Sequence, residues 1–284
     1  MDGRTDLAME AYALWKQDAQ DTTQLPGVKA REEDAGGVHI TRVDILDERG
    51  QAALGKPVGR YVTLELRALA RKEEGSFEQA AQAIGREASA FLHSPGSALC
   101  AGLGNDEITP DAFGPWALGS ILVTRHMKQR LPEAFSGFCS VSAVKPGVLG
   151  TSGIEALELV RAAADFLQPE AIIALDALAA MDPARLCTTV QLTDAGLAPG
   201  SGIGNHRAAF TKQALGRPVL AVGAPTLMRA QSLAERELPG LPGLIVTPRD
   251  ADVRVRELAR VVGFGLTLAL HPGLSVQDAA RFLA

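Results

Sequence analysis

Ala171-Ile172-Ile173-Ala174-Leu175, followed directly by Asp176, is the stretch that decides the fold of this chain of 284 residues. A short apolar run without a polar interruption is typical of a strand covered on both faces, as in a parallel sheet with helices on either side. Residues that handle ligands in such sheets lie beyond the carboxyl ends of the strands. Asp176, the first polar residue after the run, is therefore expected at the mouth of the sheet.

Strand-like and helix-like segments alternate along the rest of the chain. Strands are expected at 38–46, 60–66, 97–101, 138–144, 186–192, 218–222 and 244–246, and helices at 77–93, 110–130, 154–167, 226–237, 251–270 and 275–283. This alternation predicts an α/β fold in three layers, a mostly parallel twisted sheet with helices on both faces. Residues 1–37 are polar and poorly periodic, so an N-terminal arm is expected to precede a single domain.

The composition fits a folded protein and excludes several classes of function. The apolar fraction is 46% and the formal net charge is −5, without a Lys/Arg-rich run, so direct binding of nucleic acid is not expected. No segment reaches the roughly 18 consecutive apolar residues of a membrane helix, and the first residues lack the apolar region of a secretory signal. Three widely spaced cysteines, Cys100, Cys139 and Cys187, favour a reducing, intracellular compartment.

Asp111 is the second acid that the pattern places at the expected mouth of the sheet. It follows the strand of 97–101 by way of a turn and opens a predicted helix. Two carboxylates in a partly dry crevice cannot both ionise easily, so one pKa rises and the pair can share a proton. Such a pair can deprotonate a water with one member and protonate a leaving group with the other. A structural alternative stays open: Thr109-Pro110-Asp111 also suits a helix start, and Asp176 could cap a turn over 177–179.

Other motifs are weaker. Gly102-Leu103-Gly104-Asn105 and the segment from Gly200 to Asn205 are rich in glycine but lack the remaining residues of a phosphate loop, so tight turns are favoured. The chain has no Gly-x-Ser-x-Gly nucleophile motif. Its five histidines show no spacing typical of a metal-binding helix, so neither a metal nor another cofactor is expected.

Taken together, the segments resemble the germination protease family of spore-forming bacteria. The matching stretches include Arg4-Thr5-Asp6-Leu7-Ala8-Met9-Glu10-Ala11, Gly59-Arg60-Tyr61-Val62-Thr63-Leu64-Glu65, Gly102-Leu103-Gly104-Asn105, Thr109-Pro110-Asp111-Ala112-Phe113-Gly114-Pro115, Thr124-Arg125-His126, Pro146-Gly147-Val148-Leu149-Gly150-Thr151-Ser152-Gly153-Ile154-Glu155, Ile173-Ala174-Leu175-Asp176-Ala177, Pro199-Gly200-Ser201-Gly202-Ile203-Gly204-Asn205 and Val246-Thr247-Pro248. Their order and spacing hold across nearly the whole chain.

The resemblance implies an atypical aspartic endopeptidase without a metal, whose two essential aspartates match Asp111 and Asp176. The family hydrolyses small acid-soluble spore proteins at germination, in the spore core, and is made as inactive tetramers that remove their own N-terminal segment. Family cleavage sites read like Thr-Glu, a large apolar residue, Ala, a small residue and Glu, which Thr5 to Glu10 imitates. Self-cleavage is therefore expected between Asp6 and Leu7, leaving residues 1–6 as the propeptide and 7–284 as the protease domain.

Further expectations concern helper residues, the oligomer and alternative functions. Asn105, Glu155 and Asp194 are candidate helpers in the cleft, and Glu155 and Asp194 fit ordinary capping or surface roles equally well. Many family members carry an insertion of several dozen residues where this chain has only the short stretch 238–243. If that insertion gates the cleft or holds the tetramer together, this chain does so differently. The fold also resembles that of hydrogenase-maturation proteases, so a metal-dependent protease of that type is the alternative enzyme. The alternative without catalysis is an α/β protein that binds a phosphate at a helix N-terminus through the segment from Gly200 to Asn205.

Overall fold

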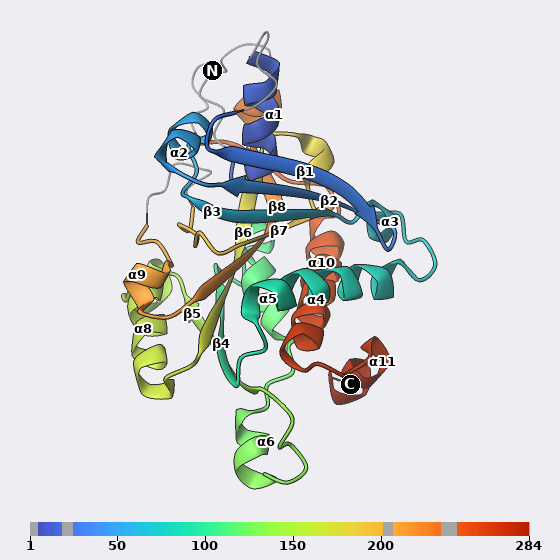
Figure 1. Ribbon diagram of the computed structural model, residues 1–284, viewed down its shortest axis with the longest axis vertical. Helices are drawn as coiled ribbons and strands as arrows, with labels where there is room; N and C mark the ends of the chain where they lie inside the picture. The colour runs from blue at the N-terminus through green and yellow to red at the C-terminus, as the bar shows by residue number, and fades with distance from the viewer. Residues whose placement is uncertain (1–4, 19–24, 201–206, 234–242, 284) are drawn as a thin grey trace.

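In the computed structural model, the predicted central strand is β6 (Ala171–Ala180), and both of its neighbours, β4 (Ser97–Leu103) and β8 (Val219–Arg229), run parallel to it (Figure 1). The structure describes residues 5–18, 25–200, 207–233 and 243–283. Within them, nine strands form one sheet in the order β1-β2-β3-β7-β8-β6-β4-β5, with β9 paired to β8. The expected α/β architecture is confirmed.

The sheet is mixed rather than parallel throughout. β5 (Ser140–Gly147), β4, β6 and β8 form the parallel part. The remaining strands are antiparallel to their neighbours: β1 (Val28–Ala35), β2 (Val38–Ile45), β3 (Gly59–Glu65), β7 (Thr189–Thr193) and β9 (Ile245–Val246). The parallel order expected from the sequence therefore holds for one half of the sheet, and antiparallel pairing builds the other half.

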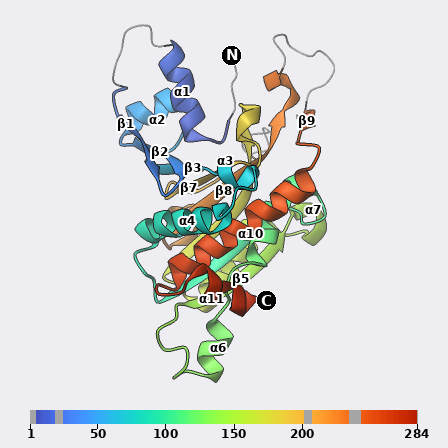
Figure 2. The ribbon, with the colours of Figure 1, turned by 90° about the vertical axis from the view of Figure 1, so that its right-hand side faces the viewer.

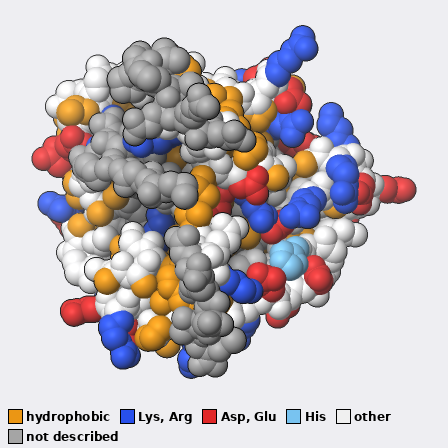
Figure 3. Space-filling view, turned by 90° about the horizontal axis from the view of Figure 1, so that it is seen from above, with side chains coloured by type: hydrophobic (Ala, Val, Ile, Leu, Met, Phe, Trp, Pro, Cys, Tyr) orange, Lys and Arg blue, Asp and Glu red, His pale blue; other side chains and the backbone are white. Residues whose placement is uncertain are grey.

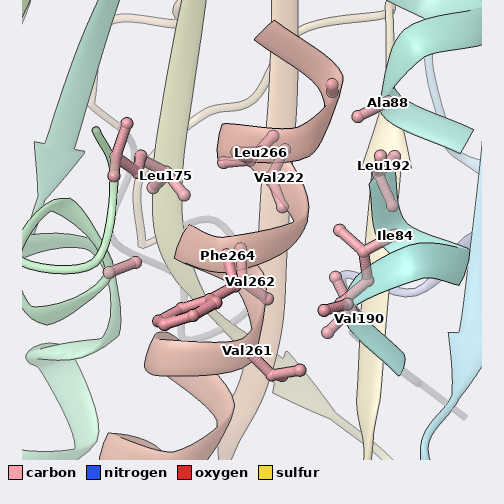
Figure 4. Packing of buried hydrophobic residues seen from close by; sticks show 14 of the residues in the cluster. Ile84, Ala88, Leu175, Val190, Leu192, Val222, Val261, Val262, Phe264 and Leu266 are labelled. Atoms are coloured by element: carbon pink, nitrogen blue, oxygen red, sulfur yellow. The ribbon is translucent and has the colours of Figure 1, made fainter. Parts of the chain in front are cut away.

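Helices cover both faces, as predicted. On one face lie α4 (Ser76–Leu92), α5 (Phe113–Leu118) and α10 (Ala251–Leu270) (Figure 2). Their side chains pack in one cluster with Ile173 and Leu175 of β6, and Figure 4 shows part of this cluster, including Leu175. On the other face, α8 (Ala156–Leu167) and α9 (Lys212–Leu215) pack with Ile172 and Ala174. Alternate residues of β6 are thus buried on opposite faces, which explains why its first five residues, 171–175, are apolar without interruption.

The predicted N-terminal arm is folded against the sheet. Ala8–Asp18 forms helix α1 and Val28–Ala35 forms strand β1, the partner of β2. Helix α2 (Glu48–Leu54) packs beside α1, and a separate apolar cluster under these elements includes Ala8, Ile45 and Leu54. β1 escaped prediction because most of its side chains are exposed and charged, so its pairing with β2 depends on backbone hydrogen bonds.

The helix predicted over 110–130 is broken into three pieces. They are a 3₁₀ turn η1 (Thr109–Asp111), α5 and a short helix α6 (Arg125–Arg130). After Ile121, whose N–H still donates to the Leu118 carbonyl oxygen, tertiary hydrogen bonds replace the helical ones. Leu122 N–H donates to the Thr267 hydroxyl at 3.0 Å, and the Thr124 hydroxyl donates to the Cys139 carbonyl oxygen at 2.5 Å.

The helix predicted over 226–237 is also wrong in its described part. β8 continues to Arg229, because Leu227 and Met228 pair with Ala179 and Ala180 of β6, and a 3₁₀ turn η4 (Ala230–Leu233) follows. Residues 234–237 and most of the short stretch 238–243 lie outside the described residues. The remaining elements are α3 (Arg67–Ala70), α7 (Leu149–Ser152), η2 (Pro183–Arg185) and α11 (Val276–Leu283).

Three further observations concern the surface and the cysteines. Among the described residues, no helix has the length and apolar character needed to cross a membrane. On the face seen from above in Figure 3, Lys and Arg side chains lie among Asp and Glu side chains. The three cysteines are buried and unpaired.

Candidate active site

Asp176 lies inside β6 rather than at its end. The strand continues for four residues to Ala180, so the expected turn over 177–179, which Asp176 could have capped, is a strand instead. In the sheet register Asp176 is beside Gly223 of β8, and Gly223 is beside Gln191 of β7. The Asp176 side chain is only 4% exposed. The sequence therefore places an acid in the middle of a buried strand, which is costly unless the acid is neutral or paired.

Asp111 reaches the same region from the turn after β4. Its carboxylate folds back toward the strand end, where Asn105 N–H donates to Oδ2 at 2.7 Å. The turn begins with Gly104 at φ +106°, and a Cβ at that position would lie 2.1 Å from the Asp111 carbonyl oxygen. Thr109 begins η1, but the residue in the N-cap position is Ile108, and no side chain caps the turn. Asp111 is thus positioned by backbone contacts with 104–105.

The two aspartates line one cavity. It has a volume of about 180 Å³, and its charged lining residues among those described are Asp6, Asp111, Glu155, Asp176 and Arg207. A second cavity of about 220 Å³ adjoins it and shares Asp6 and Asp176 with the first. Lys56, Tyr61 and Gln191 are among the other residues that line the second cavity. Asp6 and Asp176 therefore lie where the two cavities meet.

The environment raises the pKa of both aspartates. Burial raises the pKa of Asp176 well above its ordinary value, and the negative charges of Asp111 and Asp6 raise it further. Burial also raises the pKa of Asp111, although the Asn105 N–H and the positive charge of Arg207 oppose this increase. Asp176 is consequently the member of the pair that retains a proton more strongly, and Asp111 is the member that ionises first.

The N-terminal segment lies alongside the end of β6, next to these acids. Asp6 N–H donates to the Ala179 carbonyl oxygen at 2.9 Å, and Ala179 N–H donates to Asp6 Oδ2 at 2.8 Å. Leu7 is fully buried in an apolar cluster with Ala180, Leu186 and Met228. The peptide bond between Asp6 and Leu7 is thus held against the strand that carries Asp176.

Residues on either side of this bond are anchored as well. Leu7 N–H donates to the Thr5 hydroxyl at 3.1 Å, and that hydroxyl donates to the Glu10 carboxylate. Glu10 in turn accepts hydrogen bonds from the backbone N–H groups of Met181 and Asp182, at 2.9 and 2.8 Å. Lys56 Nζ donates to the Thr5 carbonyl oxygen at 2.5 Å. Burial lowers the pKa of Lys56, while Asp6 and Glu10 favour its charged form.

The structure separates the three candidate helpers. Asn105 contacts Asp111 through its backbone, while its side chain accepts from Glu107 N–H at 3.0 Å. Glu155 lines the first cavity with both aspartates. Asp194 lies elsewhere: its carboxylate accepts from Arg60 N–H at 2.8 Å, and it lines neither of the two cavities. This contact gives Asp194 a role at the end of β7 rather than beside the acids.

Sequence reasoning missed Lys56, Gln191 and Arg207. The one signal for Gln191 is a long polar side chain between Val190 and Leu192 in the predicted strand 186–192, where a buried polar group requires partners. Lys56 and Arg207 lie in loops and give no signal. Within the described parts of the chain, no three His, Cys, Asp or Glu side chains are grouped so that they could hold a metal ion. Ser201 to Asn205 of the glycine-rich segment lie outside the description.

Comparison with known proteins identifies one family. The model of the germination protease family matches residues 6–241. A germination protease of Caldanaerobacter subterraneus subsp. tengcongensis is 38% identical over 321 aligned positions, which cover 99% of this chain and 98% of the relative. One from Clostridium tetani is 32% identical with complete coverage of both chains, and one from Bacillus cereus is 39% identical over 81% of this chain and 64% of the relative.

Among solved structures, the chain has a similarity to the [NiFe] hydrogenase maturation protease HycI from Thermococcus kodakarensis KOD1. The TM-score is 0.36 at 17% identity, and the match covers 63% of this chain and 97% of that protein.

Proposed function

This chain belongs to the germination protease family and is therefore a peptidase, and we propose that it is an aspartic endopeptidase zymogen that cleaves its own Asp6–Leu7 bond. After this cleavage it degrades small acid-soluble spore proteins in the spore core. The observation that carries the proposal is the shared cavity: Asp111 and Asp176, from two different elements, line it together with Asp6.

The environments of the two acids support a different role for each: Asp111 as the general base and Asp176 as the general acid. Asp111 is the more readily ionised, so it accepts a proton from a water molecule that attacks the carbonyl carbon of the substrate. Asp176 retains its proton because burial and neighbouring negative charge raise its pKa, so it protonates the leaving nitrogen as the C–N bond breaks. Two acids whose environments separate their pKa values are suited to these opposite roles.

The contacts of residues 5–10 support self-processing at the Asp6–Leu7 bond. Leu7 is 0% exposed, so a second molecule would have to pull the segment out of the apolar cluster before it could cut there. The segment lies beside its own Asp176 instead, and Asp6 is among the charges that raise the Asp176 pKa. Cleavage within one chain is therefore the simpler route.

We also propose the oligomeric state and the metal-independent mechanism of the family for this chain. A tetrameric precursor is expected, although the chain lacks residues that relatives carry: 321 positions are aligned with the Caldanaerobacter protein, whereas this chain has 284 residues. A metal-dependent mechanism of the hydrogenase-maturation type is not favoured, because germination proteases of Caldanaerobacter and Clostridium tetani match nearly the full chain.

The experiment incubates the purified protein with a small acid-soluble spore protein, with and without a chelator, and identifies the fragments by mass spectrometry. We expect fragments cut after an acidic residue, in equal amount under both conditions. Cleavage that disappeared only with the chelator would favour the metal-dependent alternative. Absence of cleavage by protein already shortened at its N-terminus would refute the proposed substrate.

A further inference from the structure

Gln191 of β7 faces the same cavity as Asp176. Its neighbours Val190 and Leu192 pack in the cluster under α4 and α10, so Gln191 points to the opposite face of the sheet. Asp176 points to that face too, because Leu175 and Ala177 on either side of it pack in the same α4/α10 cluster. Only Gly223 separates the two residues in the register. Two steps between strands place their Cα atoms about 10 Å apart, which leaves room for a peptide group between the side chains.

The amide of Gln191 contacts both sides of the Asp6–Leu7 bond. Its Nε2–H donates to the Asp6 carbonyl oxygen at 3.1 Å, and its Oε1 accepts from Ala8 N–H at 2.8 Å. The orientation of the amide follows from chemistry, because a backbone N–H can only donate and a carbonyl can only accept. Gln191 is 5% exposed, so these hydrogen bonds are shielded from water.

We propose that Gln191 is a further catalytic residue of this site: it holds the peptide bond to be cut against the acid pair and stabilises the charge that forms on its carbonyl oxygen. The inference rests on the proposed cleavage between Asp6 and Leu7. It extends that proposal by assigning to Gln191 the role of a hydrogen-bond donor to the reacting oxygen, which the acid pair alone does not provide.

The chemistry balances without a further reactant. Asp111 takes one proton of the water while the water oxygen forms a bond to the Asp6 carbonyl carbon. The carbonyl π electrons move to the oxygen, where Gln191 Nε2–H stabilises the negative charge. The C–N bond then breaks as the charged oxygen forms the carbonyl again, Asp176 gives its proton to the Leu7 nitrogen, and a carboxyl group and an amine result.

The position of Gln191 also explains how the bond is aligned. The Ala8 N–H contact anchors the segment just after the cut, where helix α1 begins, and the Asp6 contact anchors the carbonyl before it. Both hydrogen-bonding ends of the amide are directed to the segment. An apolar residue of similar shape would fill the same space in β7 and lose both contacts.

The test compares self-processing in freshly translated full-length protein, followed by intact mass spectrometry, for the wild type, Gln191→Met and Gln191→Glu. Thr189→Val is the matched control, since Thr189 is buried, lies two residues away on the same strand and directs its hydroxyl to that of Thr188. Loss of one donor to a developing oxyanion typically slows a reaction by about 10²–10³-fold. We expect this loss for Gln191→Met and the wild-type rate for Thr189→Val.

Gln191→Glu distinguishes chemistry from packing. A protonated glutamic acid can donate to the carbonyl oxygen, whereas the ionised form cannot. The rate of Gln191→Glu relative to wild type should therefore rise as the pH falls through the pKa of the new carboxyl group, while the relative rate of Gln191→Met stays low at every pH. Circular dichroism on each variant confirms that it is folded.

The outcomes separate this inference from the proposed function. If the wild type loses residues 1–6 and Gln191→Met does so equally fast, the role of Gln191 is refuted and self-processing stands. A slow Gln191→Met together with a pH-independent Gln191→Glu would also refute the donor role. A folded wild type that never loses residues 1–6 would overturn the proposed cleavage, and the inference with it.

Discussion

Gly104→Ala should misplace Asp111 without changing any charge of the site. A Cβ at position 104 would lie 2.1 Å from the Asp111 carbonyl oxygen and 3.0 Å from Oδ1, while real Cβ contacts are essentially never below 3.0 Å. The η1 turn must therefore shift by about 1 Å, a displacement that can cost roughly 10²-fold in rate when it affects catalytic groups. That factor corresponds to about 2.7 kcal/mol of transition-state stabilisation.

Backbone strain alone must be separated from this displacement, and Gly273→Ala provides the control. Gly273 has φ +101°, close to the +106° of Gly104, and nothing lies within 4 Å of the position that an alanine methyl group would take there. Each substitution should cost about 1–3 kcal/mol of stability from the unfavourable φ. Both variants should melt at a lower temperature than wild type. Only Gly104→Ala should lose residues 1–6 more slowly, as followed by intact mass spectrometry. Equal processing rates in the two folded variants would refute the positioning of Asp111 by Gly104.

Three further predictions concern Asp176, Asp6 and the oligomer. Asp176→Asn should flatten the pH dependence of stability. Because the Asp176 pKa is raised in the fold, the protonated acid stabilises the protein below the ordinary carboxyl pKa of 3.8, and this contribution is lost as the pH rises through the raised pKa of the folded state. The variant should therefore unfold at a higher denaturant concentration than wild type at neutral pH. Asp6→Lys should block maturation, because a lysine cannot accept the Ala179 N–H bond; normal removal of residues 1–6 in this variant, detected by mass, would disprove the cleavage site. Light scattering of the precursor should give four times the 29.8 kDa of one chain, and a monomer mass would exclude the tetramer.

The sequence predicted the elements whose buried faces produce a clear pattern of apolar residues. β6 and α10 were located by their apolar residues, and the structure places a strand and a helix there. β1 and α1 were missed because β1 exposes charged side chains and pairs through its backbone, while α1 covers the sheet with a short apolar face. The break between α5 and α6 depends on Thr267 of a distant helix, which no local pattern reveals.

The positions of the candidate site residues were predictable in part. Strand-end reasoning and the family resemblance both indicated Asp111 and Asp176, and the two side chains do line one cavity. The strand-end position expected for Asp176 was wrong, because β6 continues four residues beyond it. Gln191 could not be assigned, because its contact with Asp6 joins residues 185 positions apart in the chain. Such a contact depends on the antiparallel addition of β7 to β8, which local periodicity does not encode.

The proposed catalytic role of the acid pair can be tested by following the self-processing of wild type, Asp111→Asn and Asp176→Asn, each freshly translated, with intact mass spectrometry. Asparagine keeps the shape of each side chain and removes its ability to exchange a proton. We predict that the wild type is shortened by residues 1–6 while both folded variants keep their full mass. Shortening of either variant at the wild-type rate would contradict the assignment of catalysis to this pair of aspartates.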